Sequence, residues 1–145
     1  MGSEFANKNI LKIKMSKFLA DTTVLVEMLR GNSLAKQFLE RTTPEISKVT
    51  FVELVEGCRN KEDLRLVEKT CDLLPQIKIG AVISEMAIGL LKNYKLSHGL
   101  LFLDALIAAT ALENKLVLIT ENLKDFRFIK GLKTVSQKKL LTASS

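Results

Sequence analysis

The sequence predicts an α/β fold in which a short parallel sheet is covered by helices. Short β-type runs alternate with helical patterns along the chain, and the most strand-like run is KLVLIT at 115–120. Strands that alternate with helices are typical of βαβ units, whose strands lie parallel. The 145 residues are 47% hydrophobic, which is enough to bury a core. No internal repeat or low-complexity linker is visible, so we expect one domain.

Five short β-type segments are predicted as strands, at 17–20, 45–49, 76–80, 115–120 and 132–136. The segments between them have helical periodicity. We expect helices over 23–30, 33–41, 50–58, 62–74, 81–94 and 101–114. Gly31 and Asn32 separate the first two helices, and Pro75 ends the fourth. The alanines of the last helix permit close packing.

The ends of the chain are interpreted separately from the domain. MGSEF resembles a start Met followed by two restriction-site dipeptides, so we interpret 1–14 as a cloning tail or extension. The domain is expected over 15–136, and 137–145 is expected to be a frayed tail. No signal peptide or apolar run of about 18 residues is visible, so no membrane association is expected.

Several chemistries are excluded by composition. Cys58 and Cys71 fit neither a disulfide framework nor a zinc knuckle, and are expected to be buried thiols in a reducing cytoplasm. His98 is the single histidine and lies in a polar break, which argues against Ser-His-Asp catalysis and a histidine-rich zinc site. The seven scattered glycines form no phosphate-binding loop. A net charge of +6 suits a polyanionic partner without requiring one.

Four acids occupy positions unlike those of ordinary surface residues. Asp21 follows a predicted strand, Asp125 lies just beyond another, and Glu53 and Asp104 stand among apolar residues near helix starts. Ligands of open parallel sheets bind outside the carboxyl ends of the strands. We therefore expect the four carboxylates to gather there at metal-binding distance.

Each acid also has a structural explanation. Asp21 could cap the following helix, and Thr50 with Glu53 matches a capping box. Asn122 and Asp125 could form a similar pair in a first helical turn. Asp104 could be an acid favoured at a helix start by the macrodipole. These alternatives remain open from sequence alone.

Gathered carboxylates would require a cation. Acids within about 4–6 Å raise one another's pKa values unless a positive charge compensates. No Lys or Arg is spaced to pair with them, although Lys124 is near Asp125 in sequence. Oxygen ligands without His or Cys favour Mg²⁺ or Mn²⁺. Such ions activate water and stabilise charge on a phosphoryl group, so phosphodiester hydrolysis is the expected chemistry.

Three stretches resemble the motifs of PIN-domain proteins. FLADTTVLVEML is similar to their opening strand, acid and helix, and TFVELVEG to their Glu-Leu-x-x-Gly segment. FLDALIAATALENKLVLITENLKDF is similar to their third motif, and the resemblance covers about 17–129. The small size further resembles VapC-type toxins.

The resemblance implies a compact α/β/α sandwich and a metal-dependent endoribonuclease acting on RNA. It also implies a homodimer inhibited by a cognate antitoxin. By motif match the acidic site comprises Asp21, Glu53, Asp104 and Asp125, with Mg²⁺ or Mn²⁺ as cofactor. Thr120 matches a position that helps to orient the acids or a water.

Two departures from the family pattern concern the site. Many relatives have Arg after the Thr of the last motif, where this chain has Glu121. Glu56 adds an acid three residues after Glu53, on the same helical face. The second ligand position is therefore the least certain.

Two other enzyme and signalling folds fit the sequence poorly. A haloacid-dehalogenase-type phosphatase needs a second Asp where this chain has Thr23, and a receiver domain needs paired acids that are missing. The stronger alternative is a PIN-like RNA-binding or protein-interaction module with little catalysis. The sequence does not reveal the RNA target or the number of metal ions.

Overall fold

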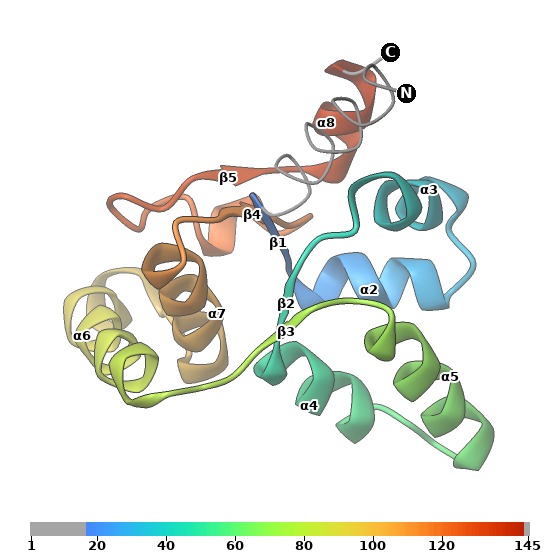
Figure 1. The fold of residues 1–145 in the computed structure, drawn as a ribbon. Helices are drawn as coiled ribbons and strands as arrows, with labels where there is room; N and C mark the ends of the chain where they lie inside the picture. Colours follow the sequence, from blue (N-terminus) through green and yellow to red (C-terminus); the bar gives the residue numbers. More distant parts are fainter. Residues whose placement is uncertain (1–16, 144–145) are drawn as a thin grey trace, which may run out of the picture.

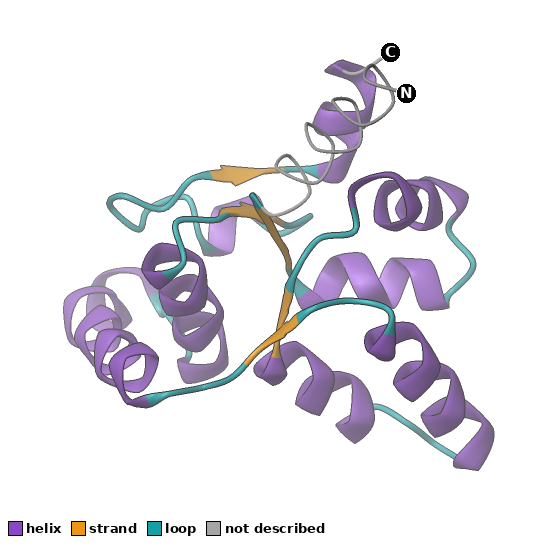
Figure 2. Cartoon of the chain, viewed as in Figure 1, coloured by secondary structure: helices purple, strands orange, loops and turns teal. Residues whose placement is uncertain are grey.

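The computed structural model describes residues 17–143 and has the predicted α/β architecture. Helices lie on both sides of a central set of short strands, so the chain forms three layers (Figure 1, Figure 2). The predictions made for 1–16 and 144–145, including the cloning tail, fall outside the described residues.

All five predicted strands form, and each is shorter than expected. They are β1 (Phe18–Ala20), β2 (Ile46–Ser47), β3 (Gln76–Ile77), β4 (Val117–Ile119) and β5 (Thr134–Val135). The six predicted helices also form, with a further helix at the C-terminal end. The helices are α2 (Thr22–Leu29), α3 (Ser33–Thr42), α4 (Lys48–Glu56), α5 (Lys61–Asp72), α6 (Ala81–His98), α7 (Phe102–Glu113) and α8 (Gln137–Ala143).

The strand pairs are parallel, as predicted. β1 pairs with β4, with Phe18 opposite Val117, and β4 pairs with β5. β2 pairs with β3. The Ala20 amide donates to the Glu45 carbonyl at 2.9 Å and the Glu45 amide donates to the Phe18 carbonyl at 3.0 Å, which connects the two sets. The resulting spatial order is β3-β2-β1-β4-β5, so the first strand lies at the centre.

Successive residues of β1 and β4 face opposite cores, as the pleat of a strand requires. Leu19 and Leu118 contact the core beneath α6 and α7. Ala20 and Ile119 contact the core formed with α2, α3, α4 and α5. Because both sheet faces are buried, the strands are continuously apolar and do not alternate with polar residues.

The alanines of α7 permit the close packing that the sequence predicts. Ala105, Ala108, Ala109 and Ala111 have no exposed surface. Small side chains let α7 approach both β4 and α6, and α7 packs extensively against α6. The body of α7 is thereby fixed against the sheet, and Asp104 directly precedes the first of these alanines.

Most helix boundaries differ from prediction by one or two residues and the end of α6 by four, and the start of α4 and the end of α6 have clear causes. α4 begins at Lys48, because Ile46 and Ser47 alone pair with β3 and the Ser47 hydroxyl accepts from the Val49 amide at 3.1 Å. α6 continues to His98, where a loop was predicted. Gly99 ends it in the left-handed conformation, with φ 71°, which glycine adopts without a steric penalty.

The prediction of a frayed C-terminal tail is wrong for 137–143. This segment is helix α8, and Leu140 packs against the core that includes α3. The Ser136 hydroxyl accepts from the Lys139 amide at 3.2 Å, as an N-cap does. A capped helix with an apolar contact is ordered where the polar composition indicated a tail.

Cys58 and Cys71 are free thiols, as predicted, with Cys71 buried and Cys58 half-buried. Burial raises the pKa of Cys71 to about 11. Within 17–143, no helix combines the length and apolar character needed to cross a bilayer.

Candidate metal-binding and catalytic site

All four predicted acids line one cavity. This acid cavity has a volume of about 280 Å³. It is lined by Asp21, Glu53, Asp104 and Asp125 together with Thr22, Thr23, Val26, Glu27, Arg30 and Asn122. Residues more than a hundred positions apart in sequence therefore meet at one place.

The topology explains this meeting. Asp21 directly follows β1, and Asp125 ends a 3₁₀ turn, η1 (Leu123–Asp125), that follows β4. Glu53 lies on α4, which begins where β2 ends. A short turn connects α7 to β4, so the N-terminal turn of α7, with Asp104, lies at the same strand ends. The cavity is thus at the carboxyl edge of the sheet.

Asp21 both caps a helix and lines the cavity. It is the N-cap of α2, and one carboxylate oxygen accepts from the Thr22 amide at 2.8 Å. The other accepts from the hydroxyls of Thr120 at 2.8 Å and Thr23 at 3.1 Å. Asp21 is only 4% exposed, and its burial raises its pKa although these hydrogen bonds lower it. The capping explanation is confirmed for Asp21, and the same side chain also lines the cavity.

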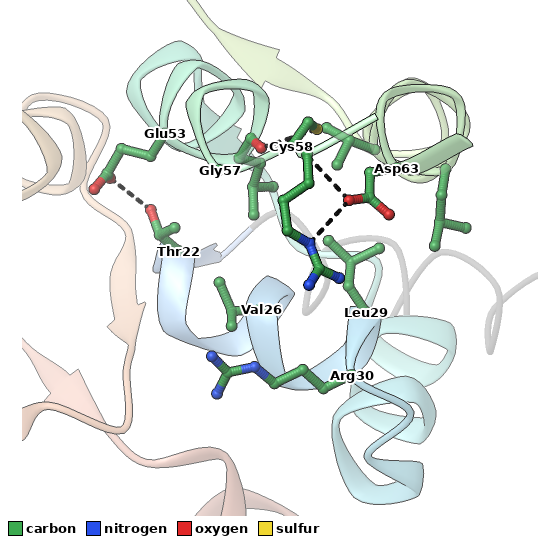
Figure 3. A pocket seen from close by; sticks show the side chains of 12 residues that line it. Thr22, Val26, Leu29, Arg30, Glu53, Gly57, Cys58 and Asp63 are labelled. Atoms are coloured by element: carbon green, nitrogen blue, oxygen red, sulfur yellow. Dashed lines mark hydrogen bonds and ion pairs between the residues drawn. The ribbon is translucent and has the colours of Figure 1, made fainter. Parts of the chain in front are cut away.

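The capping-box explanation for Glu53 is wrong. Ser47 is the N-cap of α4, so Thr50 and Glu53 lie inside the helix. The Glu53 carboxylate instead accepts from the Thr22 hydroxyl of α2 at 2.8 Å (Figure 3). Burial raises the pKa of Glu53, and the charges of Asp21 and Glu56 raise it further.

Asp104 is strongly affected by the other acids. It occupies the first turn of α7, as the helix-start explanation requires. Burial, followed by the charges of Asp21, Asp125 and Glu53, raises its pKa to about 6. The favourable helix dipole is therefore outweighed by burial and repulsion. Arg30 pairs with Glu27 and Arg59 pairs with Asp63, so neither of these arginines is paired with Asp104.

The raised pKa of Asp104 predicts how stability depends on pH without metal. Since the folded-state pKa exceeds the ordinary value of 3.8, folding favours protonated Asp104, and this stabilisation is lost as the pH rises through about 6. Asp104→Asn should therefore stabilise the metal-free protein at pH 7.5. Discounted for partial solvent exposure, the gain is on the order of 1–2 kcal/mol. Urea unfolding at pH 7.5 and pH 4 measures it, and a gain that persists unchanged at pH 4 would contradict this cause.

Thr120 connects the end of β4 to Asp21. Its buried hydroxyl donates to the Asp21 carboxylate at 2.8 Å and accepts from the Asn122 amide at 3.0 Å. The hydroxyl thus fixes both the acid and the start of the loop that leads to Asp125. This geometry agrees with an orienting position.

Thr120→Val should destabilise the protein by about 1–3 kcal/mol at pH 7.5, because the buried carboxylate of Asp21 loses one of its three donors. The Asp21 pKa should rise further, so the loss should shrink as acid protonates Asp21. Thr110→Val is the matched control, since that buried hydroxyl donates to the Leu106 carbonyl at 2.7 Å. Urea unfolding at several pH values should show a pH-independent loss for Thr110→Val, and the same behaviour in Thr120→Val would contradict the prediction.

The remaining sequence candidates lie outside the described cavity lining. The Glu121 carboxylate accepts from the Gln137 amide at 3.0 Å, which links the end of β4 to α8. Glu56 and Lys124 are also absent from the described lining. The Asn122 side chain makes no capping bond to η1, so the proposed first-turn pair with Asp125 is not formed.

The side chains of the cavity are of the kind that bind a hard divalent cation, but they are not already arranged around one position. Its oxygen-rich lining and mutually repelling acids suit Mg²⁺ or Mn²⁺. However, no three Asp, Glu, His or Cys side chains within 17–143 are arranged to hold one ion. The expectation that all four acids gather at metal-binding distance is therefore not met. Like charges separate when no cation compensates them, and Mg²⁺ usually takes only one or two carboxylates and keeps several waters.

The sequence interpretation missed Thr22 and Arg30. Thr22 fixes Glu53, and Arg30 lines the cavity from the end of α2. A usable signal was present, because Thr22, Val26 and Arg30 are spaced four apart and share one helical face. That face begins directly after Asp21.

Sequence comparison identifies the fold family. The PIN domain profile matches residues 18–131. The chain belongs to the PIN-domain family. Its three-layer fold and the position of its acids at the strand ends agree with the earlier resemblance. No curated protein matches this PIN-domain chain by sequence.

Solved structures with the same fold include chains of toxin–antitoxin complexes. A chain of a toxin–antitoxin complex from Klebsiella pneumoniae is 33% identical, with TM-score 0.70 over 82% of this PIN-domain chain and 96% of that chain. A chain of DNA-bound VapBC from Salmonella typhimurium is 22% identical, with TM-score 0.75 over 84% and 98%. A chain of VapBC-1 from nontypeable Haemophilus influenzae is 23% identical, with TM-score 0.69 over 83% and 98%. The last two likenesses concern the fold alone.

Proposed function

We propose that this PIN-domain protein is a metal-dependent endoribonuclease and the toxin of a toxin–antitoxin pair. The main support is the acid cavity, where Asp21, Glu53, Asp104 and Asp125 lie together at the carboxyl edge of the sheet. Repulsion among them contributes to the raised pKa of Asp104. Membership of the PIN-domain family supports the nuclease assignment.

The four acids are proposed to hold Mg²⁺ or Mn²⁺, directly or through waters that the ion keeps. A bound ion would activate water and stabilise charge on the phosphoryl group. Thr120 and Thr23 orient Asp21, and Thr22 orients Glu53, through the hydrogen bonds described above. Asp104 is held in place because the next residue, Ala105, is fully buried. Asp125 is held by the turn after β4. The hydroxyls therefore limit carboxylate movement while the ion is exchanged.

A cognate antitoxin is proposed as the partner, because the 33% identical chain comes from a toxin–antitoxin complex. A homodimer, a cytoplasmic location and the absence of membrane association are proposed with it, from the family resemblance. RNA is proposed as the substrate on the same basis, and the basic net charge of +6 suits a polyanion.

The proposal is tested by cleavage of a panel of end-labelled structured RNAs and matched DNAs. Cleavage should require Mn²⁺ or Mg²⁺, stop in a chelator and resume when the metal is restored. RNA should be cut and DNA left intact. RNA binding without metal-dependent cleavage across the panel would favour the alternative, a PIN-like binding module.

A further inference from the structure

The acid cavity has one basic side chain in its described lining. Beside the guanidinium of Arg30, the lining contains five carboxylates, those of Asp21, Glu27, Glu53, Asp104 and Asp125. An RNA strand is repelled by such a surface wherever no positive charge lies beside the acids. Arg30 is therefore in a position to attract a phosphate at the edge of the cavity.

Arg30 also lines a second, larger cavity. This neighbouring groove, about 540 Å³ in volume, lies among α2, α4 and α5. It shares Thr22, Val26, Arg30 and Glu53 with the acid cavity. In Figure 3, Arg30 extends back along α2 toward the end of the helix where Thr22 lies. The guanidinium thus lies at the boundary of the two cavities.

The Arg30 guanidinium is available to a ligand. Its side chain is 74% exposed, and its ion pair with Glu27, three residues earlier on the helix, is long at 3.8 Å. Exposed pairs of this kind hold a side chain only weakly. Arginine can donate two parallel hydrogen bonds to a phosphate, which gives both affinity and orientation.

We propose that Arg30 is a substrate-positioning residue that binds a phosphate of the RNA strand adjacent to the scissile bond. This inference rests on the proposed nuclease function. The strand passes from the neighbouring groove into the acid cavity across Arg30. The guanidinium holds the backbone, while the acids are left to act on the bond that is cut.

The first test compares steady-state cleavage of one RNA by wild type, Arg30→Gln, Arg30→Lys and Arg41→Gln in Mn²⁺. Arg41 is an exposed arginine on α3 outside both linings, so Arg41→Gln is a control for the change in net charge. Arg30→Gln should raise KM roughly 10-fold or more, with a smaller change in kcat. Arg30→Lys should raise KM less, because lysine keeps the positive charge. It should still raise KM, because lysine cannot donate the two parallel hydrogen bonds of a guanidinium.

The second test measures binding without cleavage. Fluorescence anisotropy with labelled single-stranded RNA compares Asp104→Asn with Asp104→Asn/Arg30→Gln over a range of salt concentrations. Loss of one phosphate contact should weaken binding and reduce the salt slope of log K by about 0.7. Thermal melts should show that Arg30→Gln leaves the fold unchanged.

The outcomes separate the two proposals. Equal KM for Arg30→Gln and Arg41→Gln, together with equal salt slopes for Asp104→Asn and Asp104→Asn/Arg30→Gln, would overturn the role of Arg30, even if wild type cleaves RNA. Absence of metal-dependent cleavage by wild type would overturn the nuclease proposal, and the binding comparison would still decide whether Arg30 contacts RNA.

Discussion

Asp104→Asn is expected to lower the rate of metal-dependent RNA cleavage at least about 100-fold, because one charged ligand of the proposed ion is lost. Asp21→Asn should have a similar effect. Neither acid takes part in the ion pairs of Arg30 with Glu27 or of Arg59 with Asp63, so the fold should remain intact. Initial rates at saturating Mn²⁺ and circular dichroism of the same samples measure both properties.

Two neighbouring glutamates provide a matched comparison on α4. Glu53 lines the acid cavity, whereas Glu56 affects it only through its charge. Glu53→Gln should impair cleavage strongly, and Glu56→Gln should leave it close to wild type. The reverse order would assign the second ligand position to Glu56. Wild-type rates in both Asp104→Asn and Asp21→Asn would contradict the proposed site.

Mn²⁺ should stabilise the folded wild-type protein, because a ligand that binds only the folded state shifts the unfolding equilibrium. At a free concentration 100 times the Kd, the gain is about 2.7 kcal/mol, or roughly 10 °C in Tm for a domain of this size. Most of this gain should be absent in Asp104→Asn. Thermal melts with increasing Mn²⁺ and with chelator measure the difference.

Asp63→Asn serves as the control for this metal titration. Asp63 is an acid on α5 that pairs with Arg59 at 3.5 Å and lies outside the acid cavity. Its variant should show the same metal-induced shift as wild type. Equal shifts in wild type and Asp104→Asn would show that Asp104 is not a ligand.

β1 and β4 were predictable because burial on two faces produces continuous apolar runs, as at Leu19 and Leu118. Helix and strand boundaries that depend on single hydrogen bonds were not predictable from the sequence. Val49 favoured a longer strand by its β-branched side chain, yet the Ser47 hydroxyl caps α4 before it. The polar residues before Gly99 suggested a loop, although that glycine is itself a helix-end signal.

The candidate acids were predictable because an acid beside an apolar run is conspicuous in sequence. The residues that contact these acids were harder to predict. The bond from Thr120 to Asp21 joins residues 99 positions apart, and only the pairing of β1 with β4 brings them together. Arg30 resembles any surface arginine until the turn of α2 places it beside the acids.

The central position of β1 has a consequence for the order in which the protein acquires its site during synthesis. The first strand leaves the ribosome early, but its neighbour β4 follows about a hundred residues later, as the pairing of Phe18 with Val117 requires. Contacts so distant in sequence form late and slowly. Asp21 and Glu53 are therefore made long before Thr120 and Asp125 can join them. The nascent chain therefore adds about a hundred residues after β1 before its site can be complete.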